Sequence, residues 1–207
     1  MEKIKGLLLL SGGIDSPVAG KLMLDKGMEL DAVYFDNFLR TENDTRDRAF
    51  QSARALGLKS IYVVRHAENL SEFGKLADQK YVCVFCKRMM LRVSEKLAKK
   101  IKADCLVTGD NLAQVASQTL PNMFIVSSAV SIPVVRPLIG LDKNEIIEYA
   151  KEFGTYGIST QRTLCCRFVP SKPSTNASSE RIKAEEKNIN IDLMVNQSIK
   201  GIEKVAL

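Results

Sequence analysis

The sequence predicts an α/β protein built on a doubly wound, mainly parallel sheet of five strands, followed by a C-terminal helical extension. Short apolar runs alternate with longer amphipathic stretches along most of the 207 residues, a pattern typical of parallel strands joined by helices. Several runs carry Val, Ile or Leu at consecutive positions, as expected for strands covered on both faces. The predicted strands are residues 6–10, 31–35, 59–64, 104–108 and 132–135.

Amphipathic stretches predict the helices between and after these strands, at residues 16–26, 44–56, 87–102 and 142–153. The last of them has clear boundary signals, because Asp142 and Glu145 are spaced as a capping box and Gly154 follows the helix. After Pro170 the composition shifts to a Ser- and Pro-containing run. We therefore predict one domain over residues 1–170, with a linker and helical extension over 171–207.

Composition narrows the class of protein. A hydrophobic content of 45% and a charged content of 26% are ordinary for a globular domain and exclude a disordered chain. No apolar run approaches the ~20 residues of a membrane span, so we expect a cytoplasmic protein without membrane contact. The net charge of +6 permits contact with a polyanion. Five cysteines without an export signal favour metal binding or sulfur chemistry over disulfides.

The turn between the first strand and the first helix has the composition of an anion site. Gly12 and Gly13 allow the chain to turn sharply and to approach a ligand closely. Ser16 is predicted to cap the helix, with Pro17 at its first position. Backbone amides at a helix start favour phosphate, although neither a Walker-type loop nor a dinucleotide fingerprint is present.

Several motifs now point to one family. Ser11-Gly12-Gly13-Ile14-Asp15-Ser16 resembles the S-G-G-x-D-S signature of the PP-loop ATP pyrophosphatases. Further blocks follow in the chain: C-V-F-C-K-R-M-M at 83–90, T-G-D-N-L-A-Q-V-A-S-Q-T-L at 108–120, R-P-L-I at 136–139, D-K-N-E-I-I at 142–147 and G-T-Y at 154–156. In this order, they resemble the catalytic domain of the tRNA 4-thiouridine synthases, the thiamine-pathway sulfurtransferase family, from about residue 6 to residue 173.

The resemblance implies an adenine nucleotide alpha hydrolase-like fold and ATP-dependent transfer of sulfur to a tRNA uridine through an adenylated intermediate. In that reading Asp15 places Mg²⁺ or orders the loop, and Lys143 contacts a phosphate. Arg88 and Gln118 are expected to face the substrate. The residues expected to bind ATP are Leu10, Ser11, Gly12, Gly13, Asp15, Ser16, Tyr34, Phe35, Gly109 and Gln114.

The cysteines would supply the sulfur chemistry. By resemblance, Cys83, Cys86 and Cys166 hold a 4Fe–4S cluster, with Cys165 as the alternative third ligand. A structural zinc site that uses both Cys165 and Cys166, and thiol or persulfide chemistry without metal, stay open as alternatives. Cys105 falls inside a predicted strand and is expected to be an inert buried thiol. The single histidine, His66, receives no role.

Partners follow from the same resemblance. Members of the family carry a ferredoxin-like region and a THUMP domain before the catalytic domain, and some carry a rhodanese domain after it. Because this chain begins near its first strand, we expect these modules to be absent and tRNA binding to be weak. A separate THUMP-type RNA-binding partner and a sulfur donor would then assist, and the basic helix 87–102 would follow a phosphate backbone. A homodimer, a small-molecule substrate and a non-catalytic nucleotide-binding subunit stay open.

Overall fold

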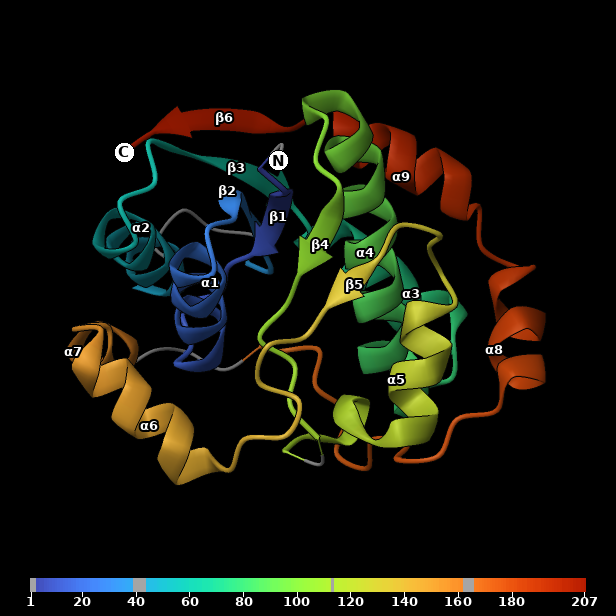
Figure 1. Ribbon diagram of the computed structural model, residues 1–207. Helices are drawn as coiled ribbons and strands as arrows, with labels where there is room; N and C mark the ends of the chain where they lie inside the picture. The colour runs from blue at the N-terminus through green and yellow to red at the C-terminus, as the bar shows by residue number, and fades with distance from the viewer. Residues whose placement is uncertain (1–2, 39–43, 113, 162–165) are drawn as a thin grey trace.

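A central sheet of six strands organises the computed structural model, which describes residues 3–38, 44–112, 114–161 and 166–207. Its strand order is β5-β4-β1-β2-β3-β6, and every pairing is parallel except the antiparallel pairing of β3 with β6 (Figure 1). The strands are β1 (Lys5–Leu9), β2 (Glu29–Asp36), β3 (Ser60–Arg65), β4 (Cys105–Val107), β5 (Val134–Val135) and β6 (Glu203–Ala206).

Helices join these strands and cover both faces of the sheet. The α-helices are α1 (Asp15–Asp25), α2 (Asp44–Ala55), α3 (Ala67–Leu76), α4 (Val82–Ile101), α5 (Leu120–Ser127), α6 (Lys143–Glu152), α7 (Tyr156–Ser159), α8 (Ser179–Glu186) and α9 (Ile191–Lys200). Two short 3-10 helices lie at Gln79–Tyr81 and Ala116–Gln118. None of the helices in the described ranges is long and apolar enough to cross a bilayer.

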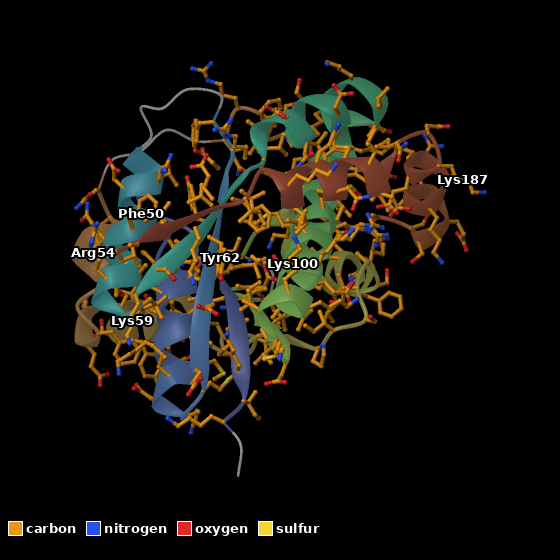
Figure 2. The ribbon with its side chains drawn as sticks, turned by 90° about the horizontal axis from the view of Figure 1, so that it is seen from above. Phe50, Arg54, Lys59, Tyr62, Lys100 and Lys187 are labelled. Carbon is orange, nitrogen blue, oxygen red and sulfur yellow. The ribbon has the colours of Figure 1, made fainter. Side chains whose placement is uncertain are left out.

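The apolar run of β1 shows why the sheet is covered on both sides. Leu7 packs into one buried cluster and Leu8 into another, because successive side chains of a strand point to opposite faces. The cluster around Leu8 takes side chains from α1, α2 and α6, and the cluster around Leu7 takes them from α3, α4, α5, α8 and α9. Figure 2 shows the two layers from above, with Phe50 and Arg54 on α2 and Lys100 on α4 across the sheet.

The predicted strands and helices are found with shifted ends, and one strand was missed. The prediction of a five-stranded sheet is wrong by one strand, because β6 adds to the edge formed by β3. This strand has four residues, most of them exposed, so it lacks the continuous apolar run that marks the buried strands. Helix α4 begins at Val82, five residues before the predicted start.

The C-terminal extension packs against the rest of the chain. Ile182 of α8 and Val195 of α9 belong to the buried cluster around α4. Glu186 of α8 accepts paired hydrogen bonds from Arg88 and Arg92, both of α4, at 2.7–2.9 Å. The extension therefore shares a core with the preceding residues, and it ends in a strand and not only in helices.

The strand order places a crevice beside β1. From β1 the chain proceeds to β2 and β3 on one side of the sheet, and then returns to β4 and β5 on the other side. The carboxyl ends of β1 and β4 consequently lie next to each other, and the loops that follow them diverge. Ligands of open parallel sheets bind at such a reversal of strand order.

Candidate active site

The loop after β1 is held by its two serines. The Ser16 hydroxyl accepts a hydrogen bond from the Ser11 amide at 2.8 Å and lies 2.9 Å from the Ser11 hydroxyl. The Ser11 hydroxyl in turn accepts from the Gly13 amide at 3.2 Å. The prediction that Ser16 caps α1 is wrong, because the helix starts at Asp15 with Ile14 at its N-cap. No side chain caps this helix in the described part of the chain, so its first-turn amides are open to an anion.

Two glycines are required by contacts between protein segments. A Cβ at Gly12 would lie 2.8 Å from the carbonyl oxygen of Thr45, on α2. A Cβ at Gly109, in the loop after β4, would lie 2.6 Å from the Ser16 amide nitrogen. At Gly13 the nearest atom would be the Ser11 hydroxyl at 3.4 Å. Gly12 and Gly109 therefore let neighbouring segments meet, and Gly13 leaves the space in front of the loop open.

A cavity of about 230 Å³ lies at this crevice. The loops after β1 and β4 line it together with side chains of α4 and α5: Leu9, Ser11, Asp15, Ser16, Lys87, Met90, Leu91, Thr108, Gly109, Asp110, Gln118 and Val126. It thus gathers several predicted site residues from distant parts of the chain. A larger cavity of about 700 Å³ lies between α3 and α9, and its lining contains no residue of either loop.

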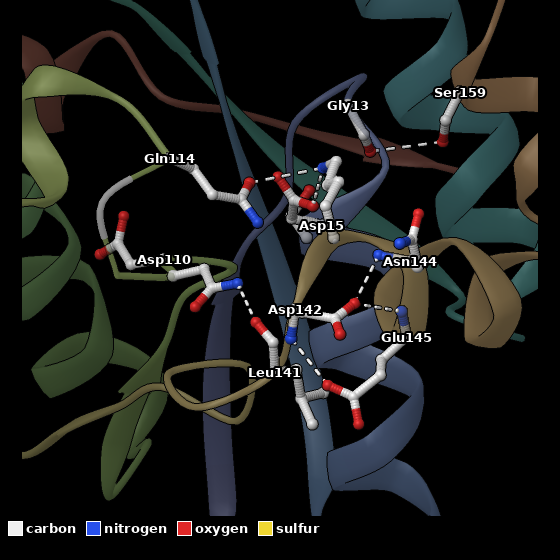
Figure 3. A network of polar contacts seen from close by, with 12 residues as sticks. Gly13, Asp15, Asp110, Gln114, Leu141, Asp142, Asn144, Glu145 and Ser159 are labelled. Atoms are coloured by element: carbon white, nitrogen blue, oxygen red, sulfur yellow. Dashed lines mark hydrogen bonds and ion pairs between the residues drawn. The ribbon is translucent and has the colours of Figure 1, made fainter.

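Three predicted site residues meet at the start of α6 (Figure 3). The Lys143 ammonium donates to the Asp15 carboxylate at 2.6 Å and to the Gln114 side-chain oxygen at 3.4 Å. The Asp15 and Lys143 side chains are 28% and 45% exposed. The predicted capping box of Asp142 and Glu145 is confirmed, and it fixes the helix start that carries Lys143.

Further hydrogen bonds tie α6 and α7 to both loops. Asn111, after β4, donates to the carbonyl oxygen of Leu141 at 2.6 Å. Ser159 of α7 donates to the Gly13 carbonyl oxygen at 3.3 Å (Figure 3). The Arg48 guanidinium of α2 donates to the Ser159 carbonyl oxygen at 2.9 Å. Sequence reasoning missed these three tethering side chains, since a tether between segments distant in the chain leaves no local pattern.

A buried carboxylate stands at the centre of the cavity wall. Asp110 forms ion pairs with Lys87 and, at 3.4 Å, with Arg136, and it accepts a hydrogen bond from the Thr108 hydroxyl at 2.9 Å. Burial alone would raise the pKa of Asp110, but Lys87, Thr108 and Arg136 together lower this pKa to about 2. Asp110 is therefore ionised at neutral pH. It lies inside the T-G-D-N block, but no local sequence pattern marks it as a buried ion-pair partner.

Gln118 lies against this carboxylate. Its amide nitrogen is 3.4 Å from the Asp110 side-chain oxygen, and the residue is 8% exposed. Its side-chain oxygen has no hydrogen-bond partner among the described residues. A buried polar atom of this kind normally has a partner, and Gln118 lines the cavity. The carboxamide oxygen is thus free to accept a hydrogen bond from a bound ligand.

Other predicted residues lie away from the cavity. Arg88 is buried, bonded to Glu186 and to the Ser128 hydroxyl, so we remove it from the proposed substrate contacts. The side chains of Leu10, Tyr34 and Phe35 are buried in the two cores. These three residues have only main-chain groups to offer a nucleotide.

The basic helix is engaged in packing over part of its length. Helix α4 packs against α3, α5 and α9, and most of its cations have partners. Lys87 pairs with Asp110, Lys96 donates to Asn196, and Lys99 pairs with Glu95. Lys96, Lys99 and Lys100, toward the end of the helix, are nevertheless exposed. Contact of this helix with a nucleic-acid backbone therefore stays a prediction.

The thiols lie beside the cavity. Cys83 and Cys86 occupy the first turns of α4, and Cys166 is close enough to raise the pKa of both electrostatically. Burial is the larger cause, and it lifts the pKa of Cys86 well above the ordinary range. The Cys86 sulfur lies 3.4 Å from the His66 Nε2 and 3.9 Å from the Met90 sulfur. Met90 lines the cavity, so Cys86 adjoins it through Met90.

The described residues do not form a ready metal site. No group of three or more His, Cys, Asp or Glu residues in the described ranges could hold a metal ion. Cys83, Cys86 and Cys166 are all free thiols, whereas Cys165 lies outside the described residues. Because Cys165 is a candidate ligand in both arrangements, the cluster and the zinc ion stay predictions. Cys105 is a buried free thiol in β4, as predicted.

Comparison with known sequences places these features in one family. The family model described as thiamine biosynthesis protein (ThiI) matches residues 2–191. A probable tRNA sulfurtransferase of Methanosarcina acetivorans is 39% identical over 97% of this chain and 50% of its own length. A probable tRNA sulfurtransferase of Coxiella burnetii is 37% identical over 98% of this chain and 53% of its own length. The chain spans about half the length of the curated relatives it matches.

Solved structures agree with this placement. The chain is similar to a 4-thiouridine synthetase crystallised with RNA and bound ATP, with a TM-score of 0.92 and 33% identity, over 98% of this chain and 55% of that one. An NMN synthetase from Francisella tularensis, at a TM-score of 0.57 and 13% identity, shares the fold alone. With the family model matched over residues 2–191 of 207, the chain belongs to the ThiI family.

Proposed function

We propose that this chain catalyses ATP-dependent transfer of sulfur to a uridine of tRNA, through an adenylated intermediate. One observation carries the proposal. The cavity between the ends of β1 and β4 brings together an uncapped anion loop, the Asp15–Lys143 pair and, next to its wall, the thiols of α4. The names printed for its relatives, tRNA sulfurtransferase and 4-thiouridine synthetase, support the same reaction.

The loop from Leu10 to Ser16 would hold the phosphates of ATP. Its first-turn amides are oriented for an anion, and the serine hydroxyls fix its shape. Lys143 would leave Asp15 to neutralise a phosphate, since both side chains are exposed enough to exchange partners. Asp15 would then be free to place Mg²⁺, which prefers carboxylate and phosphate oxygens. Main-chain groups of Tyr34 and Phe35, with Gly109 and Gln114, complete the proposed nucleotide contacts.

The uridine would enter beside Gln118. Its unpartnered side-chain oxygen can accept the N–H of a uracil ring, while its amide nitrogen can donate to a ring carbonyl. The ring carbonyl oxygen to be replaced attacks the α-phosphorus of ATP, and pyrophosphate leaves with the bonding electrons. The result is an O-adenylate, with pyrophosphate held in the loop by positioning and charge neutralisation.

In the proposed sulfur step, thiols of this chain carry the sulfur. A sulfur donor would convert one thiol of the Cys83, Cys86 and Cys166 set to a persulfide. Attack by its outer sulfur on the activated ring carbon expels AMP. A second thiolate of the set then attacks the inner sulfur, which releases the thiocarbonyl product and leaves a disulfide for an external thiol to reduce.

The sulfur carrier is testable by composition. A protein purified without oxygen that contains stoichiometric iron and acid-labile sulfide would bear the 4Fe–4S cluster implied by the resemblance. Stoichiometric zinc without iron would assign a structural metal. The mechanism above predicts neither metal and a persulfide that forms after incubation with a donor.

Recognition of tRNA would need more than this chain. Helix α4 is partly engaged in packing. The net charge of +6 therefore supplies mainly sequence-independent contacts with the phosphates of tRNA. We expect a dissociation constant of roughly 10⁻⁴–10⁻⁶ M at physiological salt, the range of non-specific binding. A THUMP-type region, in a longer chain or a separate protein, would supply the missing affinity, and the reaction would take place in the cytoplasm with tRNA and ATP.

The test is formation of the thionucleoside. Unmodified tRNA is incubated with the protein, ATP, Mg²⁺, a persulfide donor and a reducing thiol, and its nucleosides are separated and identified by mass spectrometry. We expect 4-thiouridine, with one AMP formed for each. Release of AMP on a small metabolite, with no thionucleoside even when a THUMP protein is added, would contradict the proposal and favour a small-molecule substrate.

A further inference from the structure

His66 is the single histidine of the chain, and it is fully buried beside a thiol that the proposed reaction uses. It occupies the junction between β3 and α3, where its amide donates to the Asp36 carbonyl oxygen at 2.7 Å. Its Nε2 lies 3.4 Å from the sulfur of Cys86. Sequence reasoning assigned this histidine no role.

The neighbours of the ring determine which nitrogen carries the proton. The side-chain nitrogen of Asn69 lies 3.2 Å from Nδ1, and it donates its other proton to the Ser198 hydroxyl at 3.0 Å. An amide nitrogen only donates, so Nδ1 must accept. The ring proton is therefore on Nε2 and is directed at the Cys86 sulfur.

The ring is also held in orientation and in charge state. The edge of Phe35 packs against it, with ring centroids 5.4 Å apart and an interplanar angle of 81°. Burial lowers the pKa of His66 to about 3, so the ring is neutral at physiological pH. Cys86 thus faces a neutral donor in a fixed position.

We propose that His66 is a positioning residue for Cys86. Its Nε2–H, fixed by Asn69 and by Ser198 of α9, orients the sulfur and donates a hydrogen bond to it when the sulfur carries negative charge. A buried thiolate needs such a donor, because few polar groups replace the water it has lost. This inference rests on the proposed function, in which Cys86 is one of the reacting thiols. It also gives the C-terminal extension, through Ser198, a part in the site.

The first test is the protonation of the ring. Because the chain has one histidine, protein without an affinity tag and labelled with ¹⁵N-histidine gives two ring nitrogen signals in long-range proton–nitrogen spectra. We expect the proton on Nε2, and we expect the Nε2 signal to shift in Cys86→Ala and to stay unchanged in the matched Cys83→Ala. A proton on Nδ1, or equal spectra for both variants, would overturn the proposal.

The second test is the reactivity of Cys86 at one fixed pH, followed as alkylation of its peptide by iodoacetamide. We expect His66→Leu to react about tenfold more slowly, since a hydrogen bond to a charged sulfur is lost. His66→Gln, whose side-chain nitrogen can donate from the same side, should return to within about threefold of the native rate. Equal rates in the two variants would contradict the proposal. If His66→Leu does not fold, Asn69→Leu is used in its place. We expect the His66 ring of that variant to populate both tautomers, because Nδ1 has lost its donor.

Both readouts are taken on the metal-free chain without ATP or tRNA. If the two readouts differ from the expected results, the proposed role of His66 is wrong, and the thiolation proposal is unaffected. If both readouts are as expected but no thionucleoside forms, the thiolation proposal is wrong, and the contact of His66 with Cys86 is unaffected.

Discussion

Two ion-pair networks border the same cavity and differ in their access to solvent. Asp15 and Lys143 are 28% and 45% exposed, whereas Asp110 is 11% exposed and pairs with both Lys87 and Arg136. The first network joins the loop after β1 to α6, and the second joins the loop after β4 to α4 and to the segment after β5. An exposed pair can exchange its partner for a ligand at low cost, but a buried carboxylate held by two cations cannot. We therefore expect the first network to act in the reaction and the second to stabilise the fold.

The largest expected effect comes from removing the buried carboxylate. Asp110→Ala leaves Lys87 and Arg136 without their counter-charge, and breaking a buried ion pair in this way costs about 3–5 kcal/mol of unfolding free energy. Urea unfolding followed by circular dichroism measures the loss. A cost below about 1 kcal/mol would show that solvent reaches this network as easily as the other.

Removing the exposed carboxylate should affect turnover and leave stability intact. Asp15→Asn keeps the size of the side chain but loses the charge that would order Mg²⁺ and phosphate. We expect turnover to fall about 100- to 1,000-fold, the scale of a lost electrostatic contact in a transition state. The unfolding free energy should change by about 1 kcal/mol or less. Unchanged turnover would remove Asp15 from the mechanism.

Acid should destabilise the fold by protonating the buried carboxylates. Ion pairs lower the pKa of Asp110 to about 2, below the ordinary value of an aspartate. Arg88 and Arg92 likewise lower the pKa of Glu186 to about 2, although burial alone would raise it. A carboxylate whose pKa is lowered by folding stabilises the folded protein fully at pH values above its pKa in the unfolded chain. This stabilisation is lost as the pH falls through the pKa of the group in the folded protein. We expect Asp110 to account for about 2 kcal/mol lost between pH 4 and pH 2. Asp110→Asn, compared with native protein, should show a flatter profile there.

The smallest expected effect lies at the edge of the exposed network. Gln114→Ala removes the 3.4 Å contact with Lys143, a weak hydrogen bond in a solvated position. We expect kcat/KM to fall by about threefold and the melting temperature to stay unchanged, because such a bond contributes about 1 kcal/mol or less. A loss as large as that of Asp15→Asn would contradict this ranking and show that Gln114 contributes as much to the reaction as Asp15.

Much of the fold follows from local sequence signals. The buried strands show consecutive apolar residues, and the capping box at Asp142 marks the start of α6 within one residue. β6 could not be found in this way, because its exposed residues are held by pairing with β3 and not by an apolar pattern. The early start of α4 was hidden by Cys83 and Cys86, which were interpreted as a ligand motif before the helix.

The site was predictable where it is local and unpredictable where it depends on packing. The loop motif identified Ser11, Asp15 and Ser16, and the resemblance added Lys143, which the structure brings to Asp15 across 128 residues. The resemblance predicted that Arg88 faces the substrate, yet Arg88 is buried and paired with Glu186. His66 was set aside because no sequence pattern shows that β3 ends beside the first turns of α4.

The most direct measurement is the identity of the products that the protein forms from ATP in the presence of tRNA, Mg²⁺ and a sulfur source. Chromatography of ATP labelled in the adenine ring and in the γ-phosphate separates the two outcomes. We predict AMP and pyrophosphate, with formation of both abolished in Asp15→Asn and restored by neither excess Mg²⁺ nor added tRNA. ADP and inorganic phosphate as the products would contradict cleavage at the α-phosphorus, and with it the account of the loop after β1.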